Sequence, residues 1–316
     1  ESFQKSLMGL GNGILIKKTE SSGKLNTIRM RIPIDKLGQV YIPYPPHSEQ
    51  KKISNYLKSK LEIINNLIQK TEKKIELLKE KRTSLINHCV TKGLNPNVEM
   101  KDSGVEWIGE IPINWVKTKV KFVTDLVVDG THFTPTYTDR GVPFLRVTDI
   151  HKKKIDLDKV KFISQEEHSL LIKRCKPTRG DLLLSKNGTI GLTKVVDWDW
   201  DFSIFVSLCL IRFKESFNQF LFSYFFQSDI VDRQLVESSK KSTVTNLHLD
   251  KIRELILFKP PLEEQTQIVE YLDEKTQKID STIEKETKRI ELLKEYRQSL
   301  ISEVVTGKVD VRDYNG

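Results

Sequence analysis

The sequence has little cysteine and no long apolar run, and both shortages exclude classes of protein. Its 316 residues include three cysteines, which are scattered and form no Cys-x-x-Cys pair. Such cysteines give no disulfide framework and are typical of proteins in a reducing cytoplasm. No apolar run approaches the ~20 residues that cross a bilayer, and the first residues do not resemble a signal peptide. We therefore expect a cytoplasmic protein without a membrane segment.

Motifs of common nucleic-acid enzymes are missing as well. The sequence has no GxxxxGK[ST] loop for ATP and no HExxH or other metal-ligand spacing among its histidines. The Asn-Pro-Pro-aromatic methyltransferase motif is also absent, since Asn95-Pro96 is followed by Asn97. We therefore expect a non-catalytic chain with no catalytic residues, no cofactor and no metal site.

An internal repeat is the most informative feature that is present. Residues 45–91 and 260–306 align without a gap at an offset of 215, and 24 of the 47 positions are identical. Two unrelated amphipathic helices would not share so many residues. The repeat predicts two spacer helices, residues 47–93 and 259–306, each roughly 60 Å long at ~1.5 Å per residue.

Apolar residues recur in both copies with a period of 3.5, which indicates a coiled-coil seam. The polar interruptions coincide, Thr71 with Glu286 and Arg82 with Arg297. The two helices also carry opposite net charges, which favours their antiparallel packing on each other. Two unconnected surface helices remain the alternative. The predicted seam consists of Leu57, Leu61, Ile64, Ile68, Ile75, Leu78, Leu85, Leu272, Ile279, Ile283, Ile290, Leu293 and Leu300.

The stretch between the two copies, residues 94–258, is not repeated. Its short β-type runs and one helical run predict a mixed α/β (α+β) domain. Residues 1–46 are interpreted as the C-terminal remnant of a first domain of this kind, because 27–35 align with 242–250 at the same offset. Residues 307–316 form a tail. The β-type runs are 142–148, 181–184, 190–196 and 205–213, and the helical run is 219–235.

The net charge of +9 and the pI near 9.2 favour a polyanionic partner such as nucleic acid. The excess lies in the first 93 residues, whereas residues 94–258 carry 24 basic and 22 acidic side chains. Any DNA contact of the middle domain must therefore come from local loops.

Several motifs in a fixed order carry a resemblance to a known family. They are Gly109-Glu-Ile-Pro112 with Trp115, Asp129-Gly-Thr-His132, Gly141-Val-Pro-Phe-Leu-Arg146 with Asp149-Ile150, Gly180-Asp-Leu-Leu-Leu-Ser185 followed by Gly188-Thr-Ile-Gly191, and Pro260-Pro-Leu-Glu-Glu-Gln265. With the order of domains and long helices, the chain resembles the specificity subunit of type I restriction–modification systems over nearly its whole length.

The resemblance implies a function and a set of partners. In that family, two target recognition domains each read half of a split sequence in double-stranded DNA, and the helices form the spacer and dock two methyltransferase subunits. Restriction (motor) subunits complete an assembly that is a DNA adenine methyltransferase and ATP-dependent endonuclease. A coiled-coil scaffold that does not read DNA sequence is the alternative function, and an independent DNA enzyme is a third.

The chain departs from the family pattern at its start, where most of the first recognition domain is missing. Two explanations stay open. Either the first domain has been removed, or a half-length subunit self-associates to supply two recognition domains.

Three polar loops and one strand end have chemistry suited to DNA, because base edges and phosphates require donors and acceptors. Residues 185–189 could equally be a hairpin turn, residues 240–246 a solvated loop, and Arg146 the partner of Asp149. For the aromatic pair in the acidic segment 197–201 we prefer a surface turn or a protein contact. The candidate DNA-binding residues are Thr131, His132, Arg146, Thr148, Lys186, Asn187, Lys240, Lys241, Ser242, Thr243, Thr245 and Asn246.

Overall fold

Two long helices correspond to the internal repeat. The computed structural model describes residue 38 and residues 42–151, 154–237 and 246–314. Helix α3 spans His47–Lys92 and helix α9 spans Leu262–Val305. Both are followed by a glycine with positive φ, Gly93 at 73° and Gly307 at 72°, a conformation that commonly ends a helix. The second helix begins three residues later than expected, because strand β11 (Ile256–Lys259) and two prolines precede it.

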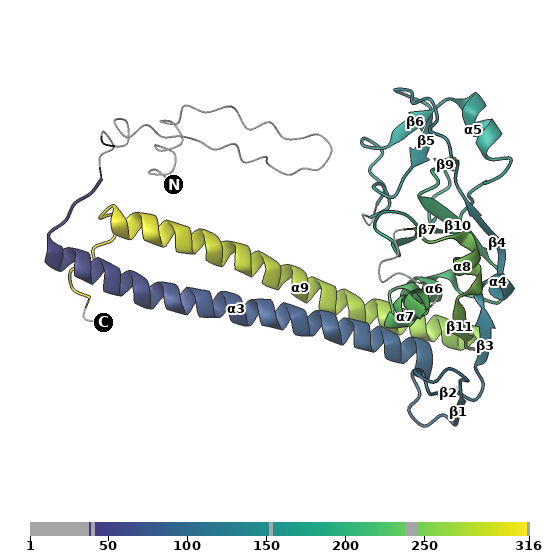
Figure 1. Cartoon of the computed structure of the whole chain (residues 1–316), viewed down its shortest axis with the longest axis horizontal. Helices are drawn as coiled ribbons and strands as arrows, with labels where there is room; N and C mark the ends of the chain where they lie inside the picture. Colours follow the sequence, from purple (N-terminus) through teal and green to yellow (C-terminus); the bar gives the residue numbers. More distant parts are fainter. Residues whose placement is uncertain (1–37, 39–41, 152–153, 238–245, 315–316) are drawn as a thin grey trace. The chain divides into compact units, whose positions relative to one another are not determined.

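The chain divides into two compact units, of which the first contains residues up to Leu77 and from Ser281 onward. Within it the two helices are antiparallel (Figure 1), since Asn65 contacts Arg297 whereas Lys74 contacts Glu286. Ile64, Ile68, Ile290 and Leu300 are buried in one cluster between them. Residues near the end of the chain return to this unit, where Tyr314 packs edge-on against Tyr56.

The second unit, Leu78–Asp280, contains the other ends of both helices and the middle domain. Arg82 pairs with Asp280, and a Cβ on Gly93 would lie 2.8 Å from Glu264 Oε1, so the helices are antiparallel here too. Their apolar side chains join the core of the domain instead of forming a separate seam. The helix residues in that core are Ile86, Cys89, Val90, Ile268, Val269 and Leu272.

The seam predicted from the heptads follows the buried side of the helices. In the first unit Ile64, Ile68, Ile290 and Leu300 are buried, and Leu57, Leu61, Ile75, Ile283 and Leu293 are half-buried. In the second unit Leu272 and Ile279 are buried, and Leu78 and Leu85 are half-buried.

The middle domain is mixed α/β, as expected. Its main sheet has four antiparallel strands in the order β4-β10-β7-β8, and a three-stranded sheet has the order β6-β5-β9. Two further pairs are β11-β3 and β1-β2. The strands are β1 Met100–Asp102, β2 Glu110–Pro112, β3 Val116–Lys119, β4 Thr124–Asp129, β5 Val142–Leu145, β6 Lys161–Ile163, β7 Leu182–Ser185, β8 Thr193–Val195, β9 Ser203–Ile204 and β10 Leu208–Phe213.

The helices of the domain are short. The run expected at 219–235 is two helices, not one, because the chain turns at Ser228. The Ser228 side chain is buried and donates to the carbonyl of Phe225 at 2.5 Å, within the turn between the two helices. The helices are α4 Val120–Val123, α5 Gln165–Leu171, α6 Gln219–Phe226, α7 Asp229–Glu237 and α8 Leu249–Glu254.

The main sheet is covered on both faces, which explains why residues 182–184 of β7 and 208–211 of β10 are all apolar. Leu182 and Leu184 enter the cluster that contains α6, α7 and the ends of the long helices. Leu183 faces the opposite cluster, with Leu208 and Leu210. Strands buried on both faces read as continuous apolar runs rather than as an alternation. Among the helices that the structure describes, none is both long and apolar enough to span a membrane.

Candidate nucleic-acid interface

Three strands of the main sheet end or begin at one edge. Strand β4 ends at Asp129, β7 ends at Ser185, and their common neighbour β10 begins at Leu208. Because β10 is antiparallel to both, the loops after β4 and β7 lie at the same edge. Two of the segments predicted to contact DNA therefore come together here.

An ion pair joins these two loops. Lys186 Nζ lies 3.2 Å from Asp129 Oδ2, and each side chain is only 6% exposed. Asp129 also contacts His132 Nε2 at 3.0 Å and accepts a hydrogen bond from Arg174. Burial alone raises the pKa of Asp129, but the hydrogen bond and charge of Lys186, and then the charges of His132 and Arg174, outweigh burial and lower the pKa overall. The carboxylate is therefore ionised at neutral pH and contacts the side chains of Lys186, Arg174 and His132.

Asn246, the described residue of the third predicted segment, joins through backbone contacts. Asn187 and Asn246 form an isolated antiparallel bridge, and the Leu247 amide donates to the Lys186 carbonyl at 2.8 Å. Asn246 is exposed and Asn187 is half-buried. Lys240, Lys241, Ser242, Thr243 and Thr245 lie outside the described residues.

The fourth predicted segment, which contains Arg146 and Thr148, is connected to the others by Ser207. The Ser207 hydroxyl oxygen is 3.4 Å from the Val147 amide, and the Ser207 carbonyl accepts a hydrogen bond from the Lys186 amide at 2.9 Å. The guanidinium of Arg146 bonds Asp149, the pairing weighed as an alternative to DNA contact. Thr148 is exposed.

The structure places the candidate side chains unequally with respect to solvent. His132 is 61% exposed, whereas Lys186 is buried against Asp129. Thr131 is buried and its hydroxyl bonds the backbone of Phe133. Lys186 and Thr131 therefore hold the loops in place in this structure, and their direct contact with DNA stays a prediction.

A glycine allows the first loop to approach the neighbouring sheet. A Cβ on Gly130 would lie 2.0 Å from the carbonyl oxygen of Ile204, which is too close for any other residue. The Thr131 amide donates to that same carbonyl at 3.1 Å, and the Val206 amide donates to Thr131 at 2.9 Å. Residues 130–131 are therefore held against β9 and the residues that follow it.

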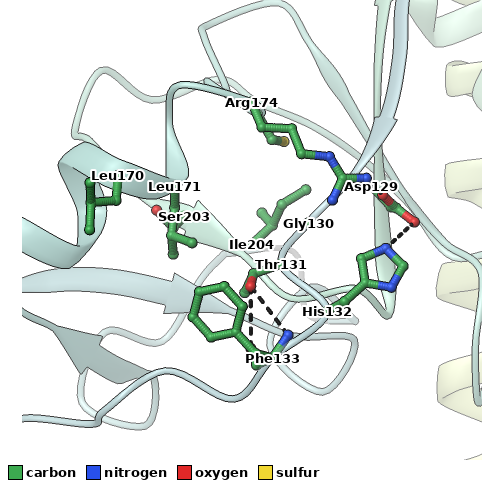
Figure 2. A pocket seen from close by; sticks show the side chains of 11 residues that line it. Asp129, Gly130, Thr131, His132, Phe133, Leu170, Leu171, Arg174, Ser203 and Ile204 are labelled. Atoms are coloured by element: carbon green, nitrogen blue, oxygen red, sulfur yellow. Dashed lines mark hydrogen bonds and ion pairs between the residues drawn. The ribbon is translucent and has the colours of Figure 1, made fainter.

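A cavity of about 310 Å³ opens beside this loop (Figure 2). Phe133, Leu170 and Ile204 give it apolar walls, and Arg174 and Asp129 lie at its polar side. Sequence reasoning missed Arg174, which follows α5 and carries no recognisable motif. Only the fold brings it from 45 positions away to Asp129.

The two tryptophans of the acidic segment pack on each other. The rings of Trp198 and Trp200 are stacked with centroids 5.0 Å apart, and both contact Phe202. Their half-buried rings belong to the edge of the domain core, which favours the interpretation as a surface turn.

Comparison with known proteins decides the family. Residues 112–294, more than half of the chain, match the family described as "Type I restriction modification DNA specificity domain". The chain belongs to this family. The alternative of a scaffold that does not read DNA gains no support from the comparisons.

Two relatives of this type I specificity protein have specificity-subunit names. The type I restriction enzyme MjaVIII specificity subunit of Methanocaldococcus jannaschii is 27% identical over 95% of this chain and 70% of its own length. The type I restriction enzyme EcoBI specificity subunit of Escherichia coli is 24% identical over 86% of this chain and 59% of its own length. The chain thus spans about three fifths to seven tenths of these relatives.

Solved structures share the fold of this specificity protein. One match is a chain of a structure that describes complex assembly and conformational transition of the type I R-M system. Its TM-score is 0.65, at 19% identity over 84% of this chain and 60% of that chain. The HsdS subunit from Thermoanaerobacter tengcongensis matches with a TM-score of 0.52, at 18% identity over 96% of this chain and 68% of that chain.

Proposed function

We propose that the chain is a non-catalytic DNA specificity subunit whose domain 94–258 reads one half of a bipartite target. The observation that carries the proposal is the convergence of four polar segments at one edge of the main sheet, around Asp129, Lys186 and Ser207. Loops held on a rigid sheet present donors and acceptors in a fixed arrangement, which reading of base edges requires.

Exchange of the domain tests this proposal. Residues 94–258 are replaced by the corresponding domain of a relative, and the methylated motif is determined by methylome sequencing of cells that also contain the methyltransferase subunit. One half of the motif should change and the other half should stay. An unchanged motif would show that the domain is a scaffold and does not read sequence.

The helices serve in this proposal as a spacer and as the docking surface for two methyltransferase subunits and for restriction subunits, in the cytoplasm. Removal of one heptad from each helix, residues 66–72 and 281–287, deletes corresponding residues of the two repeat copies. It shortens the spacer by about 10 Å, or about three base pairs. The unmethylated gap between the half-sites should shrink accordingly, and an unaltered gap would refute the spacer.

A surface on the first unit supports the presence of a further recognition domain in the assembly. In the second unit, the repeat residues Val90 and Ile268 are buried in one cluster with Trp115 and Phe217 of the recognition domain, and the cavity beside Val90 is only about 10 Å³. Val305, which corresponds to Val90, is 44% exposed and lines an open groove of about 410 Å³.

Repeated glutamines beside these surfaces favour the same partner. Gln265 donates to the carbonyl of Pro260 at 2.9 Å and accepts the amide of Asn218, a recognition-domain residue, at 2.7 Å. Gln50, its counterpart, donates to Pro45 at 2.8 Å in the same way. We propose that the groove beside Gln50 receives a recognition domain of the same kind as residues 94–258.

A charge placed in the groove tests this docking. Val305→Arg changes an exposed side chain, so the fold should persist. Docking of a domain on the groove would bury the arginine without a partner, and this cost should prevent docking. Val236→Arg, at an exposed position of α7, is the matched control. In cells, the first variant should lose one half of the methylated motif and the control should keep both. Two intact half-sites with Val305→Arg would remove the groove from the proposal.

A further inference from the structure

The cluster around Asp129 carries more positive than negative charge, and the excess faces outward. Lys186 is buried with the carboxylate and neutralises it. Arg174 is then left as a surplus cation with 56% of its side chain exposed, and His132 beside it is 61% exposed. An exposed guanidinium anchored by a buried carboxylate has a fixed direction, unlike a free surface arginine.

Three separate segments contribute to this arrangement. Arg174 follows α5, His132 follows β4, and Lys186 follows β7, so no local turn explains why they meet. Figure 2 shows Arg174 and His132 on either side of the Asp129 carboxylate, next to the cavity. The exposed guanidinium and the imidazole beside it are suited to an anion that bonds to both.

We propose that Arg174 and His132 form a seat for one backbone phosphate of the DNA, with Asp129 as the positioning residue and Lys186 as its buried counter-charge. The proposal rests on the function proposed above, because it assumes that this edge faces DNA. It assigns these four residues to register and affinity, and it leaves base reading to the neighbouring loops.

Salt-dependent binding of the full chain to a labelled mixed-sequence duplex tests the seat. Each phosphate contact contributes about 0.9 to the slope of log affinity against log salt, measured here between about 50 and 200 mM. Arg174→Gln should reduce the slope by about that amount and weaken binding to all sequences alike. The control Arg179→Gln removes an equally exposed arginine that pairs with Asp199, and it should leave the slope unchanged.

The positioning role of Asp129 is tested with a variant that keeps the net charge of the cluster, so that net charge alone predicts no change in the salt slope. The double substitution Asp129→Asn with Lys186→Met removes one charge of each sign and leaves no buried charge unpaired. If Asp129 orients Arg174, this variant should lose the same slope increment as Arg174→Gln, and adding Arg174→Gln to it should cause no further loss. A double variant with the wild-type slope would overturn the positioning role.

Two further variants keep the proposal testable if the double variant does not fold. Arg174→Lys retains the charge but lacks the fork that bonds a carboxylate and a phosphate together, so its affinity should fall toward that of Arg174→Gln. Asp181→Asn removes another buried carboxylate, paired with Arg212 at the opposite end of β7, and should leave DNA binding unchanged.

The outcomes separate this inference from the proposed function. Wild-type slope and affinity in Arg174→Gln and Arg174→Lys, with normal DNA binding by the wild type, would overturn the phosphate seat alone. Absence of salt-dependent duplex binding by the wild type would overturn the seat together with the proposed DNA function.

Discussion

Arg82 donates from Nε to Asp280 Oδ1 at 2.9 Å, and the same contact recurs 215 positions away. Arg297 corresponds to Arg82, Asn65 corresponds to Asp280, and Arg297 donates to Asn65 Oδ1 at 2.9 Å. The repeat in the sequence is thus also a repeat of side-chain contacts, one charged and one neutral. The matched arginines that interrupt the seam hold the partner helix through hydrogen bonds at its edge.

The two contacts make opposite predictions for charge substitution. Asn65→Asp gives Arg297 an ionised partner and should stabilise the chain by up to about 0.5 kcal/mol at low salt, since the pair is solvent-exposed. Asp280→Asn should destabilise by a similar amount. Urea unfolding at low and high salt measures both changes, and each should shrink at high salt. Equal effects at both salt concentrations would mean that packing, not charge, is responsible.

The buried seam predicts a larger effect that does not depend on salt. Ile68 is 6% exposed between the helices, so Ile68→Ala should cost about 2–4 kcal/mol of unfolding free energy. Ile63 is 53% exposed on the same helix, and Ile63→Ala should change stability by no more than about 0.5 kcal/mol. Thermal unfolding followed by helical circular dichroism distinguishes them. Similar costs for both would contradict the seam.

Features that depend on neighbouring residues could be predicted from the sequence, and features that depend on residues far apart in the chain could not. Local periodicity was enough for the two helices, because a coiled-coil heptad is written along the chain itself. The break at Ser228 was missed, since no glycine or proline marks the turn between α6 and α7. The role of Arg174 was also missed, because its partner Asp129 is far away in sequence.

Glu254 predicts a dependence of stability on acid pH. Its hydrogen bonds from Lys119, and then Lys121, lower the pKa of its carboxyl from 4.5 to about 2. A carboxyl with a lowered folded-state pKa stabilises the fold above its ordinary pKa, and this contribution is lost as pH falls. The difference in melting temperature between wild type and Glu254→Gln should therefore be largest above pH 4.5, shrink as pH falls toward 2 and vanish below pH 2. A difference that persists below pH 2 would assign the effect to packing.

The cysteines predict slow thiol chemistry in the native protein. Burial raises the pKa of Cys89 to about 11 and that of Cys175 to about 12, and burial likewise raises the pKa of Cys209. Because the thiolate is the reactive form, native protein at pH 8 should react with a thiol reagent only on the timescale of unfolding. Reaction in denaturant measures the total number of thiols. Rapid reaction without denaturant would show that at least one of these cysteines becomes exposed readily.

Gly130 links the fold of the sheet to the proposed DNA-reading edge. A methyl group at this position would lie 2.0 Å from the Ile204 carbonyl oxygen, so Gly130→Ala must move the loop away from β9. This movement breaks the bond from the Thr131 amide to Ile204 and shifts His132 relative to Asp129. We expect a stability loss of about 2 kcal/mol or more from the overpacking, with a further loss of duplex affinity in the fraction that remains folded. Gly109→Ala is the control, because its Cβ would meet nothing within 4 Å and its positive φ of 69° costs only local strain. If both variants lose stability equally and bind the duplex equally well, close approach at Gly130 is not what positions the loop.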